Sequence, residues 1–196
     1  MATKKWLSIV VDGNSALTPS WPKIVSEYLA KIVRAFFDNS RRQVVIPSCE
    51  LGLIMYNANN SDLGYNVQFI KWTTDVDHFL GTLSRLTFNG NNENQHTIVQ
   101  GLAEALVMFT RNMSVKEYFK GERHCILVAT GDPVPQKMLV TLPTVEEGKF
   151  VVENFKILNA HFLEVAKMFK SLEVSLSVIT PKQHPMFRSI FNVGML

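Results

Sequence analysis

The sequence predicts an α/β fold in three layers, with helices on both faces of a doubly wound, mostly parallel β-sheet that has one antiparallel edge strand. Two observations support this prediction. Short apolar runs rich in β-branched residues are typical of strands buried on both faces, and they alternate with stretches whose apolar residues recur at helical spacing. One further strand follows its predecessor across a turn without a helix between them, which indicates a hairpin at the sheet edge.

The first predicted strand contains Leu7 and the run from Ile9 to Val11, and it ends at Asp12. The turn residues Gly13-Asn14-Ser15 follow it. Parallel strands of an open sheet place their carboxyl ends at the edge where ligands bind. We therefore expect Asp12 to stand where a binding site would lie.

The first predicted helix runs from Trp21 to Phe37, where apolar residues form a wide stripe. Ser20 and Pro22 suit its cap and its first turn. The polar stretch from Asp38 to Pro47 predicts a loop, and the basic pair Arg41-Arg42 is expected on this solvated loop.

The middle of the chain predicts a hairpin followed by two helices. Glu50 to Tyr56 is the second buried strand, and Val67 to Trp72 pairs with it antiparallel across the polar turn from Asn57 to Gly64. Thr73-Thr74-Asp75 provides capping side chains for a helix that continues to Leu86. A polar loop, residues 88–95, separates it from a helix with apolar positions between Ile98 and Phe109.

After a polar, partly helical connection over residues 111–121, Cys125 to Ala129 predicts the third main strand. Pro133 to Gly148 contains three prolines and little periodicity, which indicates either an ordered loop over the site or a mobile excursion. Apolar residues at spacings of four and three from Val151 to Phe169 predict a helix. Val174 to Ile179 is the last predicted strand, and Pro185 to Asn192 the last helix.

Composition limits the classes of protein. A length of 196 residues and a hydrophobic content of 46% predict one globular domain over residues 1–196. The apolar runs are too short for a membrane span, and the N-terminus lacks the pattern of a signal peptide. A net charge of +3 is too weak to predict nucleic-acid binding. Cys49 and Cys125 fall in predicted strands, which favours buried, reduced thiols of an intracellular protein over a disulfide.

Sequence motifs of catalysis are missing, and we expect that the protein is not an enzyme. The strand-to-helix turn at Gly13 matches neither a dinucleotide fingerprint nor a phosphate-binding loop, and no Gly-x-Ser-x-Gly elbow occurs. Ser15 stands where a nucleophile could sit, which leaves a hydrolase as an alternative, but no base is placed by sequence. The five histidines have no metal-ligand spacing: His78, His96, His124, His161 and His184.

Four polar residues from three predicted loops are expected at the same end of the sheet: Asp12, Asn14, Thr97 and Asp132. Side-chain oxygens from several loops are the ligands that Mg²⁺ and Mn²⁺ prefer. The alternative interpretation is that Asp12 and Asn14 only cap the turn and the following helix.

This element order and constellation resemble the von Willebrand factor A domains, a Rossmann-like fold. Their metal-ion-dependent adhesion site uses Asp-x-Ser-x-Ser after the first strand, with a threonine and an aspartate from later loops. The chain has Asp12-Gly13-Asn14-Ser15-Ala16, and Thr97 and Asp132 match within about a residue. Two hydroxyl ligands are replaced by Asn14 and Ala16, so the resemblance implies a degenerate metal site that does not function.

Longer stretches are similar to the amino-terminal von Willebrand factor A domain of the Mediator complex subunit 25 family, with the plant branch closest. The resemblance covers nearly the whole chain, is weakest between Pro133 and Gly148, and is carried by these segments: residues 21–37, 50–57, 101–109, 123–129 and, most specifically, 175–192. It implies a nuclear protein without a cofactor. It also implies docking to other Mediator subunits in the regulation of RNA polymerase II transcription, with transcription factors reached only indirectly and no direct contact to nucleic acid or membrane.

Two further expectations follow. A docking module needs a contact surface, and Thr180 to Phe191 is one place to look for it, although Pro181 to Pro185 equally suits a plain strand-to-helix connector. The alternative function is a divalent-metal-dependent ligand-binding domain of the adhesion type. In that case Mg²⁺ or Mn²⁺ would bind near Asp12 and Asp132, and an acidic ligand group would complete its shell.

Overall fold

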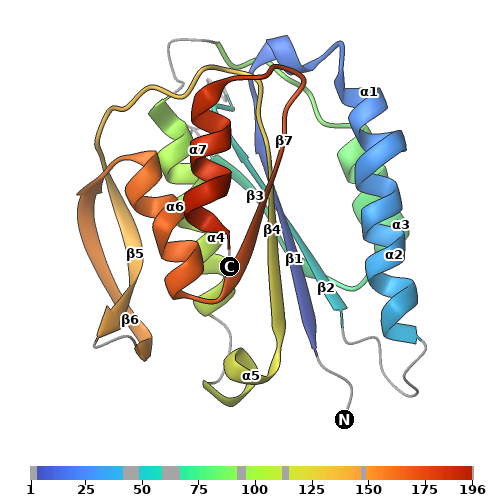
Figure 1. The fold of residues 1–196 in the computed structure, drawn as a ribbon. Helices are drawn as coiled ribbons and strands as arrows, with labels where there is room; N and C mark the ends of the chain where they lie inside the picture. Colours follow the sequence, from blue (N-terminus) through green and yellow to red (C-terminus); the bar gives the residue numbers. More distant parts are fainter. Residues whose placement is uncertain are drawn as a thin grey trace.

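The fold was analysed in a computed structural model, which describes residues 4–41, 49–58, 67–91, 96–111, 115–146 and 149–195. Figure 1 shows a central sheet with helices on both sides. The strands follow the order β3-β2-β1-β4-β7, and their bounds are Lys5–Asp12 (β1), Cys49–Tyr56 (β2), Val67–Thr73 (β3), Glu122–Val128 (β4) and Val174–Ile179 (β7).

The sheet has the predicted parallel and antiparallel pairs. β1 pairs in parallel with β2 and with β4, and β4 pairs in parallel with β7. β3 pairs antiparallel with β2 and forms one edge, so the mixed sheet predicted from the sequence is confirmed. β1 lies at the centre, and from Trp6 onward each of its residues is buried, as the apolar run predicts for a strand covered on both faces.

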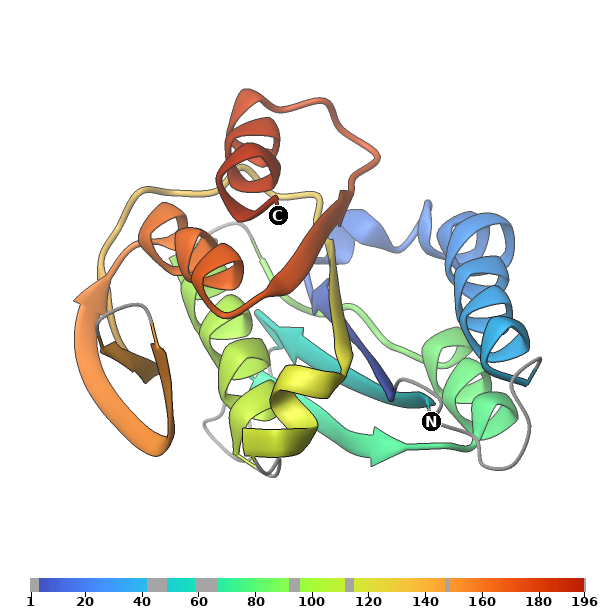
Figure 2. The ribbon, with the colours of Figure 1, turned by 60° about the horizontal axis from the view of Figure 1, so that its bottom comes forward.

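The helices cover both faces (Figure 2). Their bounds are Trp21–Ile24 (α1), Ala30–Arg41 (α2), Val76–Ser84 (α3), Ile98–Thr110 (α4), Val115–Lys120 (α5), Phe162–Ser171 (α6) and Pro185–Gly194 (α7). A 3-10 turn, Ser15–Leu17 (η1), follows β1, and a π-helical segment, Val25–Leu29 (η2), joins α1 to α2. The predicted helix from Trp21 to Phe37 is therefore present with a π-helical interruption.

Two apolar clusters fill the space between the layers. α4, α6 and α7 pack on one face of the sheet around Leu102, Phe162 and Phe187. α1, α2 and α3 pack on the other face, in a cluster that includes Trp21 and Phe79. Alternate residues of β1 enter the two clusters, which is the period-2 pattern of a strand between two layers.

Two sequence predictions between β4 and α6 were wrong. Pro133–Gly148, predicted as a loop, contains β5 (Met138–Glu146), and the first half of the helix predicted from Val151 to Phe169 is β6 (Lys149–Ala160). The two strands form an antiparallel hairpin outside the main sheet. The helix begins only at Phe162, because the side chain of His161 accepts the amide N–H of Leu163 and Glu164 accepts that of His161.

The hairpin explains why the apolar spacing from Val151 to Phe169 wrongly predicted one continuous helix. Val140 and Leu142 on its inner face are buried against α4, whereas Leu139 and Ile157 on its outer face are 72% and 71% exposed. Leu158 pairs with Val140, so it belongs to a β ladder even though its distance from Phe162 suits a helix. Residues 149–160 form a strand because they pair with β5, and the spacing of apolar residues along the sequence does not report this pairing.

Smaller predictions have mixed outcomes. Cys49 and Cys125 are buried free thiols in the two clusters on opposite faces of the sheet, as expected for reduced cysteines. Burial raises the pKa of the Cys49 thiol to about 12.

Arg41 is the last residue of α2 instead of a loop residue, and Arg42 lies outside the described residues. The predicted turns at Asn57–Gly64 and 88–95 are described only up to Ala58 and Asn91.

No helix among the described residues has the length and the apolar character that crossing a bilayer requires.

Candidate functional site

Asp12 lies at the carboxyl end of β1 and is fully buried. Its Oδ1 accepts hydrogen bonds from the amide of Asn14 at 3.0 Å and from Nδ2 of Asn57 at 3.2 Å. Its Oδ2 accepts from the amides of Gly131 at 3.2 Å and Thr130 at 3.4 Å. One carboxylate thus connects the turns that follow β1, β2 and β4.

The backbone holds these turns close together. The amide of Gly13 donates to the carbonyl of Tyr56 at 2.7 Å, and the amide of Gly90 donates to the carbonyl of Gly13 at 2.9 Å. A Cβ atom on Gly13 would lie 2.6 Å from the Asn57 carbonyl oxygen, and one on Gly90 would lie 2.0 Å from it. Only glycine fits at these two positions, because the neighbouring group is backbone and cannot move away.

Asn14 and Ala16 close the turn after β1. The Asn14 side chain is buried, and its Oδ1 accepts the amide N–H of Ala16 at 2.9 Å, which caps η1. Ala16 has no side-chain oxygen. Thr97 is buried at the N-terminus of α4, where its side chain forms no capping hydrogen bond. The capping interpretation of Asn14 is confirmed by this geometry.

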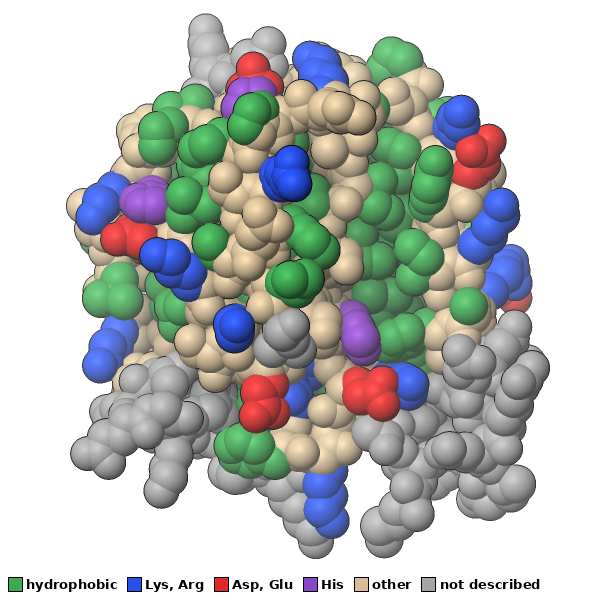
Figure 3. Space-filling view, viewed as in Figure 1, with side chains coloured by type: hydrophobic (Ala, Val, Ile, Leu, Met, Phe, Trp, Pro, Cys, Tyr) green, Lys and Arg blue, Asp and Glu red, His purple; other side chains and the backbone are tan. Residues whose placement is uncertain are grey.

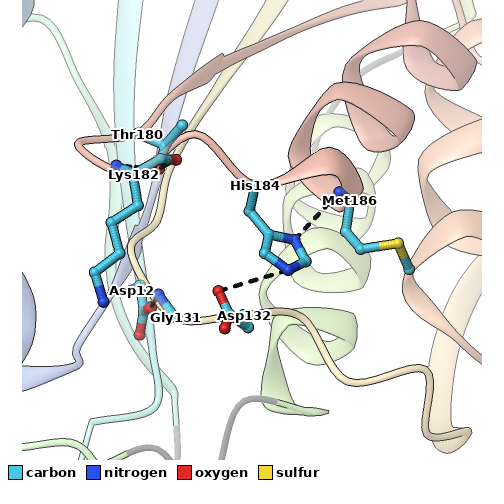
Figure 4. Close-up of polar contacts among 7 residues, drawn as sticks. All are labelled: Asp12, Gly131, Asp132, Thr180, Lys182, His184 and Met186. Carbon is cyan, nitrogen blue, oxygen red and sulfur yellow. Dashed lines mark hydrogen bonds and ion pairs between the residues drawn. The ribbon is translucent and has the colours of Figure 1, made fainter.

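Asp132 follows Gly131, but its carboxylate faces another partner (Figure 4). Its Oδ1 lies 3.8 Å from Nε2 of His184, and its side chain is 71% exposed. His184 accepts the amide N–H of Met186 at its Nδ1, 3.2 Å away, and so caps α7. The Asp132–His184 pair therefore links the turn after β4 to the start of α7, and Asp132 is not among the contacts of Asp12.

The residues present do not fit a divalent cation at the adhesion-site position. A carboxylate has about four lone-pair directions, and four N–H groups already occupy those of Asp12. Asn14 uses its oxygen in the turn, Ala16 offers none, and Asp132 faces His184. Across the described part of the chain, no group of three or more His, Cys, Asp or Glu side chains could hold a metal.

Ser15, the candidate nucleophile, is exposed in η1. Within the residues described, no histidine contact to its hydroxyl is found, and His161 and His184 cap helices instead. The arrangement around Ser15 therefore does not build a nucleophile and base pair.

Asn57 is the site residue that the sequence analysis missed. It follows β2 directly, is buried, and adopts a left-handed backbone conformation with φ of 54°. Besides donating to Asp12, its Nδ2 donates to the carbonyl of Asn91 at 2.9 Å. An asparagine directly after a buried strand was the available signal, because asparagine tolerates positive φ better than most residues.

Comparison with known proteins identifies relatives along the whole chain. Residues 2–195 match the family model described as Mediator complex subunit 25 von Willebrand factor type A. Two curated proteins named Mediator of RNA polymerase II transcription subunit 25 are similar: that of Solanum lycopersicum is 35% identical over 195 residues, and that of Arabidopsis thaliana is 37% identical over 200 residues. The alignments cover 96% and 97% of this chain but only 24% and 23% of the relatives, so the chain spans about a quarter of their length.

Among solved structures, the SpRpn10 VWA domain superimposes with a TM-score of 0.60 and 14% sequence identity. The superposition covers 98% of this chain and 82% of that one. This similarity shows the fold, a von Willebrand factor A arrangement of sheet and helices.

Proposed function

The chain belongs to the family of Mediator complex subunit 25 von Willebrand factor type A domains, and we propose that it is a protein-interaction module that docks on the Mediator complex. The observation that carries the proposal is the family match, which extends over the whole described fold. Docking in this way would make the chain part of the regulation of RNA polymerase II transcription.

The geometry at the strand tips supports docking through protein surface and not through a bound cation. The two carboxylate oxygens of Asp12 accept four hydrogen bonds, which hold three turns in place. We propose that this constellation has a structural role and binds neither Mg²⁺ nor Mn²⁺. Non-catalytic docking also agrees with the surroundings of Ser15, which lack a base among the described contacts.

The proposed partners are other Mediator subunits, and the proposed compartment is the nucleus. Both rest on the two curated relatives, whose names place them in Mediator. We propose that transcription factors are reached only through other parts of the assembly, with no direct contact between this chain and nucleic acid or membrane.

Affinity capture tests the docking proposal. The tagged chain is incubated with nuclear extract, and the bound proteins are quantified by mass spectrometry with and without EDTA. We expect several Mediator subunits to be enriched together, to the same extent under both conditions. A folded chain that captures no Mediator subunit would contradict the proposal, and capture that EDTA abolishes would favour the metal-dependent alternative.

Titration calorimetry tests the metal proposal directly. Mg²⁺ and Mn²⁺ are titrated into the protein and into its Asp12→Asn variant, which retains one side-chain oxygen and removes the charge. We expect no heat above that of dilution for either protein. Saturable heat for the unmodified protein that is absent in the variant would show a functional adhesion site.

A further inference from the structure

The strand β6 has one edge that is not paired within the described fold. β6 is 12 residues long, and among the described residues it pairs with β5 alone. Figure 1 and Figure 2 both draw β6 at the margin of the molecule, and α4 packs mainly against β5. In an antiparallel pair, alternate residues exchange hydrogen bonds with the partner strand. The residues between them therefore direct their N–H and C=O groups away from β5.

The side chains on both faces of β6 leave this edge accessible. All four residues from 156 to 159 are exposed, with Ile157 on the outer face of the hairpin and Leu158, which is 44% exposed, on the inner face. The last strand of the main sheet differs, because in β7 the side chain of Leu176 is 2% exposed and Gly194 at the end of α7 lies against it. The accessible edge is thus on the hairpin and not on β7.

Apolar side chains adjoin the edge. Leu139 of β5 is exposed on the same outer face as Ile157, and Figure 3 shows apolar and basic side chains at the surface on the flank where Figure 1 draws β6. The segment from Asn154 to Ala160 has Lys156 as its single charge and contains no proline. This is less protection than an exposed strand edge usually has, so the edge is suited to pairing with another chain.

The charge at this edge is positive. Within the described ranges Lys156 forms no ion pair, whereas Lys137 next to β5 is paired with Glu164 at 3.7 Å. Arg111 at the end of α4 lies over the ring of Phe155 in β6, with its Cζ 5.8 Å from the ring centroid. An acidic side chain beside Lys156 would therefore complement the charge of the strand.

We propose that the edge of β6 binds an extended segment of a partner protein, in which apolar and acidic residues alternate, as a third strand of the hairpin. Backbone hydrogen bonds to β6 would supply the pairing. The apolar residues would lie beside Ile157 on the outer face, and the acidic residues would lie beside Lys156 on the other face. An unpaired edge, exposed apolar neighbours and complementary charge favour recognition by strand addition, and a third strand stabilises a two-stranded hairpin.

The proposal deepens the proposed docking function and rests on it for the origin of the segment, which a Mediator subunit would supply. It places the contact surface on β6 and leaves Pro181 to Pro185 as the connector between β7 and α7, where His184 caps α7. A second copy of this chain suits the edge less well. Antiparallel pairing of two β6 strands would bring both Lys156 side chains to the same face of the joined sheet.

Fluorescence anisotropy with defined peptides tests the proposal independently of Mediator. The probe is a fluorescein-labelled peptide, Val-Glu-Val-Glu-Val-Glu-Val, and the charge control has lysine in place of each glutamate. Two further peptides carry N-methyl groups on alternate backbone amides, at the valines in one and at the glutamates in the other. Only alternate amides of an added strand face β6. We therefore expect saturable binding of the probe and of one N-methyl peptide, and no binding of the other or of the lysine peptide.

Three results of this measurement would overturn the proposal. They are no binding of the probe, equal binding of the lysine peptide, and equal binding of the two N-methyl peptides. Sedimentation velocity of the protein alone tests the other occupant, because a dimer that Ile157→Thr dissociates would show that a second copy fills the edge.

Protein variants locate the binding. Lys156→Glu is expected to weaken binding of the probe about tenfold, and Lys156→Gln is expected to weaken it less. Ile157→Thr keeps a β-branched side chain in the strand but removes apolar surface, so it is also expected to weaken binding. Lys31→Glu, the same charge reversal at an exposed position of α2 on the other side of the sheet, is expected to leave binding unchanged. Circular dichroism checks that each variant is folded. Equal weakening by Lys31→Glu and Lys156→Glu, or none by Lys156→Glu, would overturn the assignment to β6.

The same variants separate this proposal from the docking function. If the unmodified chain and Lys156→Glu capture Mediator subunits equally, docking stands and β6 is excluded as its contact surface. If capture is lost in Lys156→Glu and retained in Lys31→Glu, β6 is the contact. If even the unmodified chain captures none, the docking proposal fails, and the peptide measurement still decides whether the edge of β6 binds acidic segments.

Discussion

At the scale of single residues, Asp12 shows how a buried carboxylate at a strand tip can serve the fold. A buried carboxylate is stable only when hydrogen bonds or charges compensate its lost hydration. Here four N–H groups from three turns provide this compensation. Asp12, which the sequence places in a degenerate metal site, therefore holds three turns at the strand tips together.

Asp12→Ala is expected to destabilise the protein by about 3 kcal/mol or more, because it leaves several buried N–H groups without an acceptor. The free energy of unfolding in urea, measured with and without magnesium, checks this. The matched control is Asp132→Ala, whose exposed side chain contributes at most about 0.5 kcal/mol through its pair with His184. Equal losses for the two variants would contradict the assignment.

His124 predicts a pH dependence of stability. Burial lowers the pKa of its imidazole, and the opposing effect of Glu122 is smaller. The unfolded chain therefore binds a proton at higher pH than the folded protein does, so stability decreases as the pH falls through the unfolded pKa of about 6.5. Above that pH, His124 is neutral in both the folded and the unfolded protein, so it does not make stability depend on pH.

Urea unfolding at a series of pH values between neutral and mildly acidic measures this effect. His124→Gln removes the titrating group and keeps a polar side chain beside Phe36. The centroids of the Phe36 and His124 rings are 5.2 Å apart. We expect a smaller decrease of stability on acidification in the variant. The same decrease in both proteins would show that other groups are responsible.

At the scale of elements, the β5–β6 hairpin extends the three-layer fold. Its inner face packs against α4 and joins the cluster that contains α6 and α7. Its two strands are held by their own ladder and stand apart from the five-stranded sheet. The helix-like spacing in β6 was overridden because β6 pairs with β5, whose Val140 and Leu142 are buried when alternate residues face the same side.

Leu142→Ala and Leu139→Ala test this register. Leu142 is 1% exposed, so its truncation leaves a cavity and is expected to cost about 2 to 4 kcal/mol of unfolding free energy. Leu139, on the opposite face of the same strand, is expected to change it by less than about 0.5 kcal/mol. Similar losses at both positions would be evidence against a strand with one buried face.

At the scale of the whole molecule, two apolar clusters share one central sheet. Trp21 lies in the cluster of α1, α2 and α3, and its Nε1 donates to the carbonyl of Leu83 at 2.8 Å. Trp72 packs against the opposite cluster, and its Nε1 donates to the carbonyl of Met108 at 3.2 Å. Because β1 contributes to both clusters, neither is expected to persist after the other is lost.

We expect the two faces to unfold in a single transition, which tests the prediction of one domain over residues 1–196. Two proteins with one tryptophan each are needed, one retaining Trp21 and the other Trp72, with phenylalanine at the remaining tryptophan positions. In each protein the urea midpoint by fluorescence is expected to coincide with the midpoint by far-UV circular dichroism. Separate midpoints within either protein would show that the faces unfold independently.

The sequence alone determined the strand–helix alternation, the mixed sheet, and the position of Asp12 at a strand tip. These features depend on local periodicity and on turn residues, both of which can be recognised in short segments of the sequence. Family membership was predictable for a related reason, since the matching segments are continuous stretches such as residues 175–192.

The roles of these elements depend on contacts between residues that are distant in the sequence. The donors to Asp12 include Asn57 and Gly131, which lie 45 and 119 residues away, and Asp132 faces a histidine of the last helix connector. The β5–β6 pairing and the position of β7 at the end of the sheet likewise depend on which strands become neighbours. Hydrogen bonds and burial act between groups that are close in space, and no local pattern in the chain records such distant pairs.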